Sequence, residues 1–507
     1  MKNLLKISVI VCLLAFLATS CNEKDEIQGS DVEGLGASIQ AVIDLGLPGG
    51  ADPVDGDGNV TVSRDVLLTA GNSYILHNYF RIQSGHTITI EPGVVIRGEQ
   101  GGASTDDIAP GTLVIERDAQ IDAQGNASSP IVFTSNQSSP NPGDWGGVVL
   151  LGKADVNISA TGGAQASGTD GLGFIEGLPT PNNTGRYGNG DLTPGDYNND
   201  NSGTMQYVRI EYAGDEIGEA NELNGLTLGG VGSGTTLDHI MVSFGFDDAF
   251  EFFGGTVNAK YLIANQIQDD DFDTDQGYSG KIQFGISRKT PGQNIVSSPI
   301  NGFESNGDSD DSYTSAMTDG TFSNITVIGP IYTGSTSVLA NYRYGAFIRD
   351  DSHLNIFNSI IVGYPYAQLW LETPGDFDDD GDDTTDNLVS IEGVTLVFPT
   401  WTTWNGVTAQ CTNVTNFTSV AAYNNECMEA SSSGTGRRSL PAQTGLSSSA
   451  WSTSSPSFVA TLEKSSDFSN DLVQDSFFTQ VDFRGAFGNS SDSNNANWNI
   501  ASSWVQW

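Results

Sequence analysis

The sequence predicts an all-β fold, a right-handed parallel β-helix (a solenoid of short strands) with N- and C-terminal caps and long loop inserts. Short segments in which apolar and polar residues alternate recur along the 507 residues, and Gly, Asn, Asp and Pro separate them. Helical periods are absent from the sequence. Stacked strands of this kind bury one continuous core and need a cap at each end.

The segments recur at nearly constant intervals. Ile90 and Ile115 are 25 residues apart, and in the C-terminal half Ile325, Ile360 and Val394 follow one another after 35 and 34 residues. A period of about 20 to 50 residues indicates a solenoid. Each strand is expected to lie on the equivalent strand of the previous rung, about 4.8 Å away. Segments far apart in the sequence would therefore become neighbours along the stack.

The N-terminus is typical of an exported protein. Lys2 precedes an apolar run, Ile7–Leu17, which is shorter than the roughly 20 residues that a transmembrane helix needs. The run ends in small residues and Cys21, and this ending resembles the bacterial lipoprotein signal, although its leucine stands four places before the cysteine instead of three. We expect residues 1–20 to be a signal peptide and Cys21 to carry lipid. An ordinary signal peptide with a chance cysteine is the alternative.

Residues 21–37 are polar and are expected to form a flexible tether. Within them, Asn22–Glu26 contains a lysine followed by two acids and resembles the export signal of Bacteroidota surface lipoproteins. We expect a lipid-anchored protein of the outer membrane, exposed on the cell surface; a lipoprotein that faces the periplasm is the alternative. Residues 38–507 are expected to form a single β-helix domain with loop inserts near residues 136–203 and 409–455.

The charge of the chain limits its partners. Lysine and arginine total 20 against 62 acidic residues, a formal net charge of −42. Such a surface repels phosphates, which argues against nucleic acid and against anionic lipid, so that contact with a membrane is expected only through the lipid anchor. The charge favours cations and neutral or basic ligands. A simpler explanation of much of this negative charge is that it keeps the protein soluble in a salty exterior.

The four cysteines have separate predicted roles. Cys12 lies in the signal peptide and Cys21 is the predicted lipidation site. Cys411 and Cys427 remain, 16 residues apart, and in an oxidising compartment they are expected to form one disulfide. Closing a loop of that length stabilises a fold by about 3 kcal/mol. A zinc site is not expected, because none of the four histidines is spaced as a ligand with a cysteine.

A family resemblance supports the same fold. Ile88–Ala123 resembles the opening rungs of right-handed β-helix proteins of the pectate-lyase-like group. Gly143–Gly147, Glu251–Val257 and Asp271–Tyr278 resemble phrases of a family of surface lipoproteins from Bacteroidota and other Gram-negative bacteria, and the ending from Arg484–Gly488 onward fits as well. The resemblance implies a β-helix over most of the chain and a lipid-anchored surface protein. It implies no established activity.

The strongest candidate site is a set of aspartates in two predicted turns. Asp247 and Asp248 follow one apolar strand, and Asp269–Asp271 follow the next. Asp247 and Asp270 are 23 residues apart, which is taken as one rung. We therefore expect the two clusters to lie on neighbouring rungs, about 5 Å apart along the stack.

These carboxylates favour a bound cation. Asp271, Asp273 and Asp275 alternate, so in an extended strand they would project to one side, where Asp248 and Glu251 would join them. Carboxylates at close range raise one another's pKa unless a cation intervenes. Oxygen ligands without histidine suit Ca²⁺. The sequence predicts a Ca²⁺ site here, with a solvated acidic edge as the alternative.

A second acidic segment has the residue order of an EF-hand calcium loop. Its alternating carboxylates are Asp376, Asp378, Asp380 and Asp382. Ligands at alternate positions wrap one ion, and the glycine between the last two permits the sharp turn. The twelfth position holds Asn387 where an EF-hand has a bidentate glutamate, so only modest affinity for Ca²⁺ is expected. An acidic solvated loop is the alternative.

The first cluster also permits a catalytic interpretation. Asp247, Asp248, Asp270 and Asp271 resemble in layout the aspartates that serve polygalacturonases, themselves right-handed β-helices, as general acid and base. Inverting glycosidases hold such carboxyls about 6.5 to 9.5 Å apart. The His-Gly and Arg-x-Lys elements of that family are not found on the following rungs, and Arg349 lies several rungs further on. These departures put the assignment in doubt.

The predicted function is that of a lipid-anchored binding or adhesion protein, stabilised by Ca²⁺, that recognises glycans or a surface protein. The first alternative is a polysaccharide-active enzyme, a glycoside hydrolase or lyase, and the second is a structural coat or spacer protein. Five aromatic residues bear on this choice: Tyr364, Tyr366, Trp370, Trp401 and Trp404. They would stack on sugar rings if exposed, or close the C-terminal end of the core if buried, and burial is the preferred interpretation.

Overall fold

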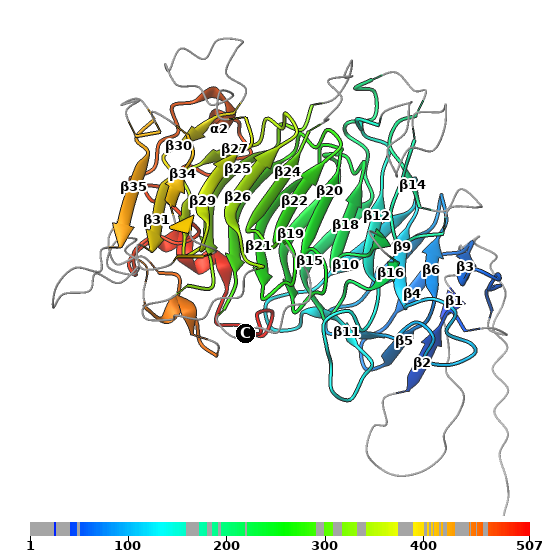
Figure 1. Ribbon diagram of the computed structural model, residues 1–507. Coiled ribbons are helices and arrows are strands. Elements are labelled where there is room, and N and C mark those ends of the chain that lie inside the picture. The colour runs from blue at the N-terminus through cyan, green and yellow to red at the C-terminus, as the bar shows by residue number, and fades with distance from the viewer. Residues whose placement is uncertain are drawn as a thin grey trace, which may run out of the picture.

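The chain winds into an elongated stack of short parallel strands (Figure 1). None of the helices in the described part of the chain is long and apolar enough to cross a membrane. The structure, a computed structural model, describes residues 25–26, 41–47, 51–158, 172–179, 185–190, 194–218, 221–290, 299–307, 317–331, 341–373, 389–399, 403–404, 407–408, 410–414, 417–418, 423–430, 446, 448–452, 454–459 and 465–507.

One face of the stack is an 11-stranded parallel sheet, here called sheet B. Each rung adds one strand to it, so residues more than 20 positions apart become lateral neighbours. Its strands in order are β3 (Asn59–Val62), β6 (Tyr79–Ile82), β9 (Thr112–Ile115), β12 (Gly147–Leu151), β18 (Leu226–Gly229), β20 (Phe250–Phe253), β22 (Phe272–Asp275), β24 (Phe303–Asn306), β26 (Tyr344–Arg349), β29 (Ala367–Leu371) and β34 (Gln410–Thr412).

The remaining two faces share an 18-stranded sheet, here called sheet A. Its N-terminal strands are β1 (Asp25–Glu26), β2 (Val42–Leu45), β4 (Val66–Leu68), β5 (Ser73–Leu76), β7 (Thr87–Ile90), β8 (Val95–Gly98), β10 (Gln120–Gln124) and β11 (Ile131–Ser135). Its central strands are β15 (Gly203–Glu211), β19 (Thr236–Ser243), β21 (Asn258–Asn265), β23 (Lys281–Arg288) and β25 (Thr321–Ile328). Its C-terminal strands are β27 (Asn355–Phe357), β28 (Ile360–Val362), β30 (Ile391–Glu392), β31 (Thr395–Pro399) and β35 (Glu426–Ala430). The prediction of an all-β right-handed parallel β-helix is confirmed.

Each long central strand of sheet A bends at one residue and so serves two faces. Tyr207, His239, Tyr261 and Phe284 occupy this corner on successive rungs, all with φ between 50° and 64°. A residue with a side chain has a higher free energy when its backbone adopts this left-handed conformation. The rings offset part of that cost by stacking, with centroids 4.3, 4.4 and 5.2 Å apart along the series. The corner therefore forms an aromatic ladder parallel to the axis of the stack.

The inward side chains of the three faces form one continuous apolar core that runs the length of the stack. Phe250, Phe272 and Phe303 illustrate its regularity, because they hold the same position on three successive strands of sheet B. Their ring centroids are 5.6 and 5.1 Å apart. In strands such as β22 buried and partly exposed residues alternate, so the intervening side chains face outward.

The pairing between rungs differs from the spacing suggested by the sequence. Ile90 pairs with Ala123, whereas Ile115 belongs to sheet B and not to the same sheet as Ile90. Ile360 pairs with Thr326, one residue from the predicted partner in that strand. The predicted 25-residue repeat is wrong because Ile90 and Ile115 lie on different faces of the stack.

The predicted inserts and tether contribute strands of their own. Residues 136–203 include β12, and residues 409–455 include β34 and β35. The two strands of the predicted second insert are joined by the disulfide between Cys411 and Cys427, which is confirmed, with Cα atoms 6.0 Å apart. β1, inside the predicted tether, pairs with β4. Three hairpins outside the sheets are β13 (Gly173–Phe174) with β14 (Arg186–Tyr187), β16 (Glu216–Gly218) with β17 (Asn221–Glu222), and β32 (Thr403–Trp404) with β33 (Val407–Thr408).

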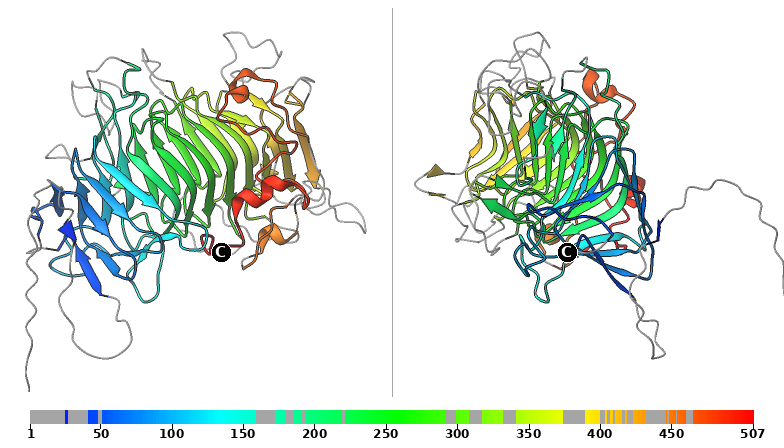
Figure 2. Two further views of the ribbon diagram at one scale, coloured as in Figure 1. Left: turned by 180° about the vertical axis from the view of Figure 1, so that it is seen from behind. Right: turned by 90° about the vertical axis from the view of Figure 1, so that its right-hand side faces the viewer.

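Residues 465–507, here called the C-terminal strap, cover an outer face of sheet A (red in Figure 2). The strap contains α2 (Asp471–Gln474) and the 3-10 helix η3 (Ser493–Trp498), and a separate 3-10 helix, η2 (Ser448–Trp451), precedes it. Trp498 and Trp504 are buried against apolar side chains of the central strands. Near its end the backbone N–H of Trp504 donates to the carbonyl of Ala127 at 3.2 Å. These tryptophans therefore cover a side of the stack.

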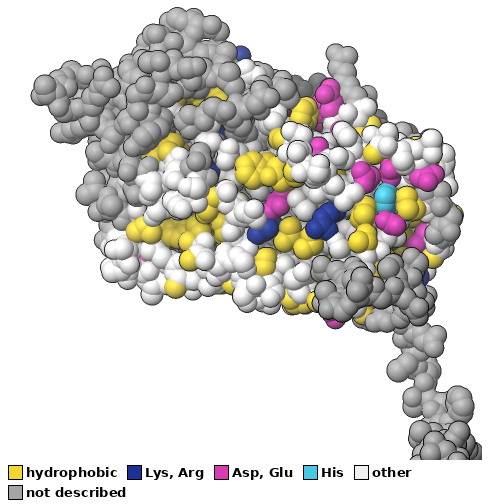
Figure 3. Space-filling view, turned by 90° about the horizontal axis from the view of Figure 1, so that it is seen from below, with side chains coloured by type: hydrophobic (Ala, Val, Ile, Leu, Met, Phe, Trp, Pro, Cys, Tyr) yellow, Lys and Arg dark blue, Asp and Glu magenta, His cyan; other side chains and the backbone are white. Residues whose placement is uncertain are grey.

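Acidic side chains are not spread evenly over the molecule. The underside carries mainly uncharged side chains, with the visible acidic ones gathered toward one end (Figure 3).

Candidate cation site

An open pocket of about 220 Å³ lies at the outer face of sheet B, beside the N-terminal ends of β20 and β22. One basic side chain, that of Arg349, lines it. The nine acidic residues of its lining are Glu176, Glu222, Asp247, Asp248, Glu251, Asp269, Asp270, Asp273 and Glu304. This set, with Arg349 and Pro299, is here called the acidic pocket.

The solenoid itself gathers most of these residues. Phe250 pairs with Phe272, so the register places Asp247 beside Asp269 and Asp248 beside Asp270, each 22 residues apart. The predicted neighbouring-rung arrangement is thus found. The predicted pairing of Asp247 with Asp270 was off by one residue.

A ladder of side chains fixes the turns that carry the aspartates. The Oδ1 atom of Asn224 accepts a hydrogen bond from the backbone N–H of Asp248 at 3.2 Å, and Oδ1 of Asp248 accepts from the N–H of Asp270 at 2.8 Å. The series continues from Asp270 to the N–H of Asn301 at 2.5 Å, and from Asn301 to the N–H of Tyr344 at 3.1 Å. Asp248 and Asp270 therefore occupy positions that asparagine fills on the rungs to either side. In both residues Oδ1 accepts the backbone hydrogen bond of the ladder, and Oδ2 of Asp270 also accepts a hydrogen bond from the side-chain amide of Asn301 at 3.3 Å.

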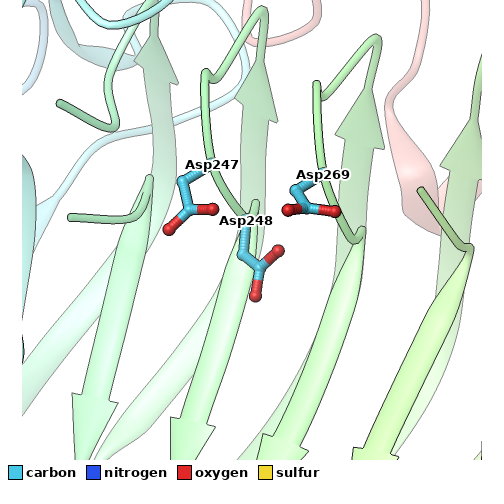
Figure 4. Close-up of side chains that lie close together, drawn as sticks. All are labelled: Asp247, Asp248 and Asp269. Carbon is cyan, nitrogen blue, oxygen red and sulfur yellow. The ribbon is translucent and has the colours of Figure 1, made fainter. Parts of the chain in front are cut away.

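The carboxylates approach one another as the ligands of an ion do (Figure 4). One oxygen from each of Asp247, Asp248 and Asp269 lies within 4.8 Å of the others. A second triad of the same kind consists of Asp248, Glu251 and Asp273. Asp248 belongs to both triads and thus stands at the centre of the site.

Burial and mutual repulsion raise the pKa of these acids. For Asp248 and Glu251 burial is the largest cause, and the neighbouring carboxylates Asp247 and Asp273 add to it. The pKa of Asp270 is raised by burial and then by Glu304. The buried Oδ1 atom of Asp273 has no hydrogen-bond donor among the described residues. A set of acids in this state takes up protons or a cation, because either one removes the repulsion.

Asp271 does not line the acidic pocket, so its position does not support its predicted roles as a metal ligand and catalytic acid. Its carboxylate forms a fully buried ion pair with Lys289, at 2.9 Å, and accepts a hydrogen bond from Ser287. The Lys289 ammonium also donates to the carbonyls of Ile267 and Asp269, at 2.9 and 2.6 Å. Asp271 precedes β22, so it does not share the outward alternation of Asp273.

Asp275 is also absent from the pocket lining, so its predicted metal role is not supported by position. It is two residues beyond Asp273 on β22, and its carboxylate accepts a hydrogen bond from the backbone N–H of Gln276 at 2.5 Å. Burial raises its pKa to about 7. Of the four predicted catalytic aspartates, Asp247, Asp248 and Asp270 line the pocket.

Several pocket residues were missing from the predicted site. Glu304 holds the same position on β24 as Glu251 on β20 and Asp273 on β22, so correct pairing of the strands would have found it. Glu176 and Glu222 come from segments outside the two main sheets, and no signal in the sequence placed them here. Arg349 forms an ion pair with Glu304 at 3.1 Å, so the basic group reaches the pocket from β26.

The remaining sequence-predicted sites divide between described and undescribed residues. Tyr364 is buried in the core, whereas Tyr366 and Trp370 are half-buried on the outside of the stack. Residues that lie outside the described part of the chain, or whose side chains do, are Cys21, Asp376, Asp378, Asp380, Asp382, Trp401 and Trp404.

Comparison with known proteins agrees with the architecture. No curated protein and no solved structure matches the chain. A family model described as a pectate-lyase-like β-helix domain matches residues 58–451, which is more than three quarters of the sequence. The matched region begins one residue before β3 and includes every residue of the acidic pocket. The chain therefore belongs to the pectate-lyase-like β-helix family.

Proposed function

We propose that this protein is a lipid-anchored cell-surface binding protein whose acidic pocket holds a divalent cation, with Ca²⁺ as the ion that fits best. The observation that carries the proposal is the pair of carboxylate triads that share Asp248, each with its oxygens within 4.8 Å of one another. Carboxylate oxygens without nitrogen or sulfur ligands are the donor set of Ca²⁺. The predicted signal peptide and the predicted lipidation site Cys21 support the anchor.

The charge balance of the pocket supports a cation more strongly than the donor type alone. Nine acidic side chains face one arginine, and that arginine already pairs with Glu304. Two ladder asparagines hydrogen-bond to part of the set, since the amide of Asn224 donates to Glu251 and that of Asn301 donates to Glu304 at 3.0 Å. Among the described residues no side-chain amide donates to Asp247, Asp248 or Asp273, and these three, with Asp269, belong to the carboxylate triads.

An open pocket leaves part of the ion's coordination sphere to a ligand. Ca²⁺ takes six to eight oxygen ligands, more than one carboxylate triad supplies. A ligand hydroxyl, carboxylate or carbonyl oxygen would complete the sphere. Ion binding and ligand binding are thus expected to depend on each other.

Calorimetric titration of the purified, chelator-treated protein with CaCl₂ tests the proposal. We expect a saturable heat signal that Asp248→Asn removes, because this substitution keeps the ladder oxygen and takes away the shared ligand charge. Asp57→Asn is the control, since Asp57 is exposed and lies outside the pocket. Absence of saturable binding in the wild-type protein, or equal binding by the two variants, would refute the site.

A second candidate function is a polysaccharide-active enzyme. Arg349 lines the same open pocket as Asp247, Asp248 and Asp270, and burial raises the pKa of those three acids, as a general acid requires. The triad oxygens lie within 4.8 Å, which argues against an inverting glycosidase, because the carboxyls of those enzymes are roughly 6.5 to 9.5 Å apart. Release of reducing ends or unsaturated products from a panel of polysaccharides, lost in Asp270→Asn, would make the enzyme the better interpretation.

A further inference from the structure

A histidine stands in the aromatic ladder beneath the end of the C-terminal strap. His239 holds the corner position on β19 between Tyr207 on β15 and Tyr261 on β21, and its ring stacks on both, with centroids 4.3 and 4.4 Å away. Trp504 of the strap lies edge-on to the same ring at 5.2 Å. His239 is thus buried between two neighbouring strands and residues 493–507, here called the strap end.

Both ring nitrogens of His239 face hydrogen-bond acceptors. Nδ1 contacts the carboxylate of Asp238, and Nε2 lies 2.7 Å from the backbone carbonyl oxygen of Asn497 in η3. A neutral imidazole has one N–H, so either tautomer would turn a lone pair toward one of these oxygens, whereas the imidazolium donates to both. The docked strap end therefore fits the charged form of this histidine.

The ionisable side chains around His239 come from the strands and not from the strap end, whose residues include no Asp, Glu, Lys, Arg or His. They are Asp238 on β19, Tyr207 and Arg209 on β15, and Lys260 and Tyr261 on β21. Burial raises the pKa of Tyr261 to about 12, so this phenol stays neutral at moderate pH. Burial lowers the pKa of Lys260, and the charge of Asp238 opposes that effect. Histidine is the side chain that ordinarily changes charge between about pH 5 and 8.

Other contacts of the strap end do not involve a histidine. The side-chain amide of Asn499 donates to the hydroxyl of Tyr207 at 2.9 Å, and Arg209 donates to the carbonyl of Ser503 at 2.8 Å. The indole of Trp504 is fully buried. Loss of the imidazolium charge is therefore expected to weaken the docking of the strap end and to leave the rest of the fold in place.

We propose that His239 is a pH-sensitive latch: its imidazolium holds the strap end on sheet A, and loss of the proton favours release. The docked state binds the proton more tightly than a released state in which the ring meets water, so docking is favoured at low pH and weakens as the pH rises. One repulsive contact in a buried site should change the ratio of docked to released molecules by about tenfold or more. Release would uncover the aromatic ladder on the outside of sheet A.

Hydrogen–deuterium exchange of the full chain in CaCl₂, at about pH 5 and about pH 8 and corrected for the intrinsic effect of pH on exchange, tests the latch. The informative peptide is the strap end, where the backbone N–H of Trp504 donates to the carbonyl of Ala127. We expect its protection to fall about tenfold or more at the higher pH in the wild-type protein. In His239→Gln, whose side chain does not titrate, protection should be equal at the two pH values.

Two further variants separate the charge of the ring from its packing. Asp238→Asn keeps the histidine and removes the neighbouring negative charge, so protection should be lost at a lower pH than in the wild-type protein. His86→Gln is the matched control, because His86 also lies beside an aspartate, Asp65, but precedes β7, away from the strap. It should retain the wild-type response. Melting curves of each variant check folding.

The readout is local, so it does not depend on the cation site. Equal protection of the strap end at the two pH values in the wild-type protein would overturn the latch. An equal fall in wild-type and His239→Gln proteins would also overturn it, since another group would then be responsible. A response that His239→Gln abolishes and His86→Gln retains would support the latch whether or not the protein binds Ca²⁺.

Discussion

Oδ1 of Asp248 accepts a hydrogen bond from the backbone N–H of Asp270, 2.8 Å away and 22 residues further along the chain. The same carboxylate belongs to both triads of the acidic pocket. Asp248 thus has a structural role, which asparagine could fill, and a charged role, which asparagine could not. The two roles can be separated by substitution.

Asp248→Ala should lower the free energy of unfolding by about 1–3 kcal/mol, because the N–H of Asp270 would lose its acceptor in a buried turn. Asp248→Asn should unfold at a urea concentration at least as high as the wild-type protein in EDTA, since it keeps an acceptor and removes a buried charge. Urea denaturation of the two variants checks this. Equal stability of the Ala and Asn variants would show that the ladder bond contributes nothing.

Without a cation, the protein should lose stability as the pH rises. The pKa of Asp275 rises from its ordinary value of 3.8 to about 7, and burial raises that of Asp248 as well. A folded-state pKa above the unfolded value means that the folded protein binds more protons, so its stability is greatest at low pH and falls as these groups ionise. Thermal melting in EDTA should show a lower Tm as the pH passes from about 4 to above 7.

Ca²⁺ should reduce that fall in Tm, because the ion takes the place of the protons in the pocket. The same melts in CaCl₂ measure the effect, and Asp57→Asn serves as a control that leaves the buried acids intact. A Tm that rises through this pH range in EDTA would contradict the assignment of raised pKa values.

Lys289→Met should destabilise the fold by about 3–5 kcal/mol, because it leaves the carboxylate of Asp271 buried without its counter-ion. Both side chains are fully buried in the ion pair. Adding Asp271→Asn should recover part of the loss, since no buried charge then remains. Urea unfolding of the single and double variants measures the difference, and a double variant no more stable than the single one would rule out charge as the cause.

Reduction of the disulfide, or the double substitution Cys411→Ser with Cys427→Ser, should cost about 3 kcal/mol, because the unfolded chain regains the freedom of a 16-residue loop. The bond joins β34 to β35 at the C-terminal end of the stack, away from β20 and β22. Calorimetry should therefore find the same affinity for Ca²⁺ in the wild-type protein and the double variant. A large loss of affinity would mean that the pocket depends on the C-terminal rungs.

Cys21→Ser should release the protein from the membrane fraction, because the lipid is the proposed anchor and the described residues contain no helix able to cross a bilayer. Fractionation of expressing cells measures the shift, and protease treatment of intact cells reports surface exposure of the wild-type protein. Cys12→Ser is the control, since Cys12 lies within the predicted signal peptide. Equal membrane retention of Cys21→Ser and the wild-type protein would refute lipid anchoring.

The sequence alone determined the fold class, the disulfide and the neighbourhood of the site. Apolar alternation and frequent turn residues specify short strands, and strands with one apolar face must stack to bury it. Two cysteines in one predicted loop left a single pairing. Asp247, Asp248 and Asp270 were recognised because aspartates that follow two successive strands must meet when those strands become neighbours.

Only the tertiary structure decided which acids share the pocket. The alternation of aspartates in the sequence grouped Asp271 with Asp273, but Asp271 precedes β22, and its carboxylate is buried in an ion pair with Lys289, the residue after β23. To identify Glu304 as a pocket residue, one must know the register between β22 and β24. To identify Glu176, one must know where a segment distant in the sequence packs. Side-chain alternation is a local property of one strand, whereas register and packing depend on turn lengths and contacts between distant segments, which no single stretch of sequence encodes.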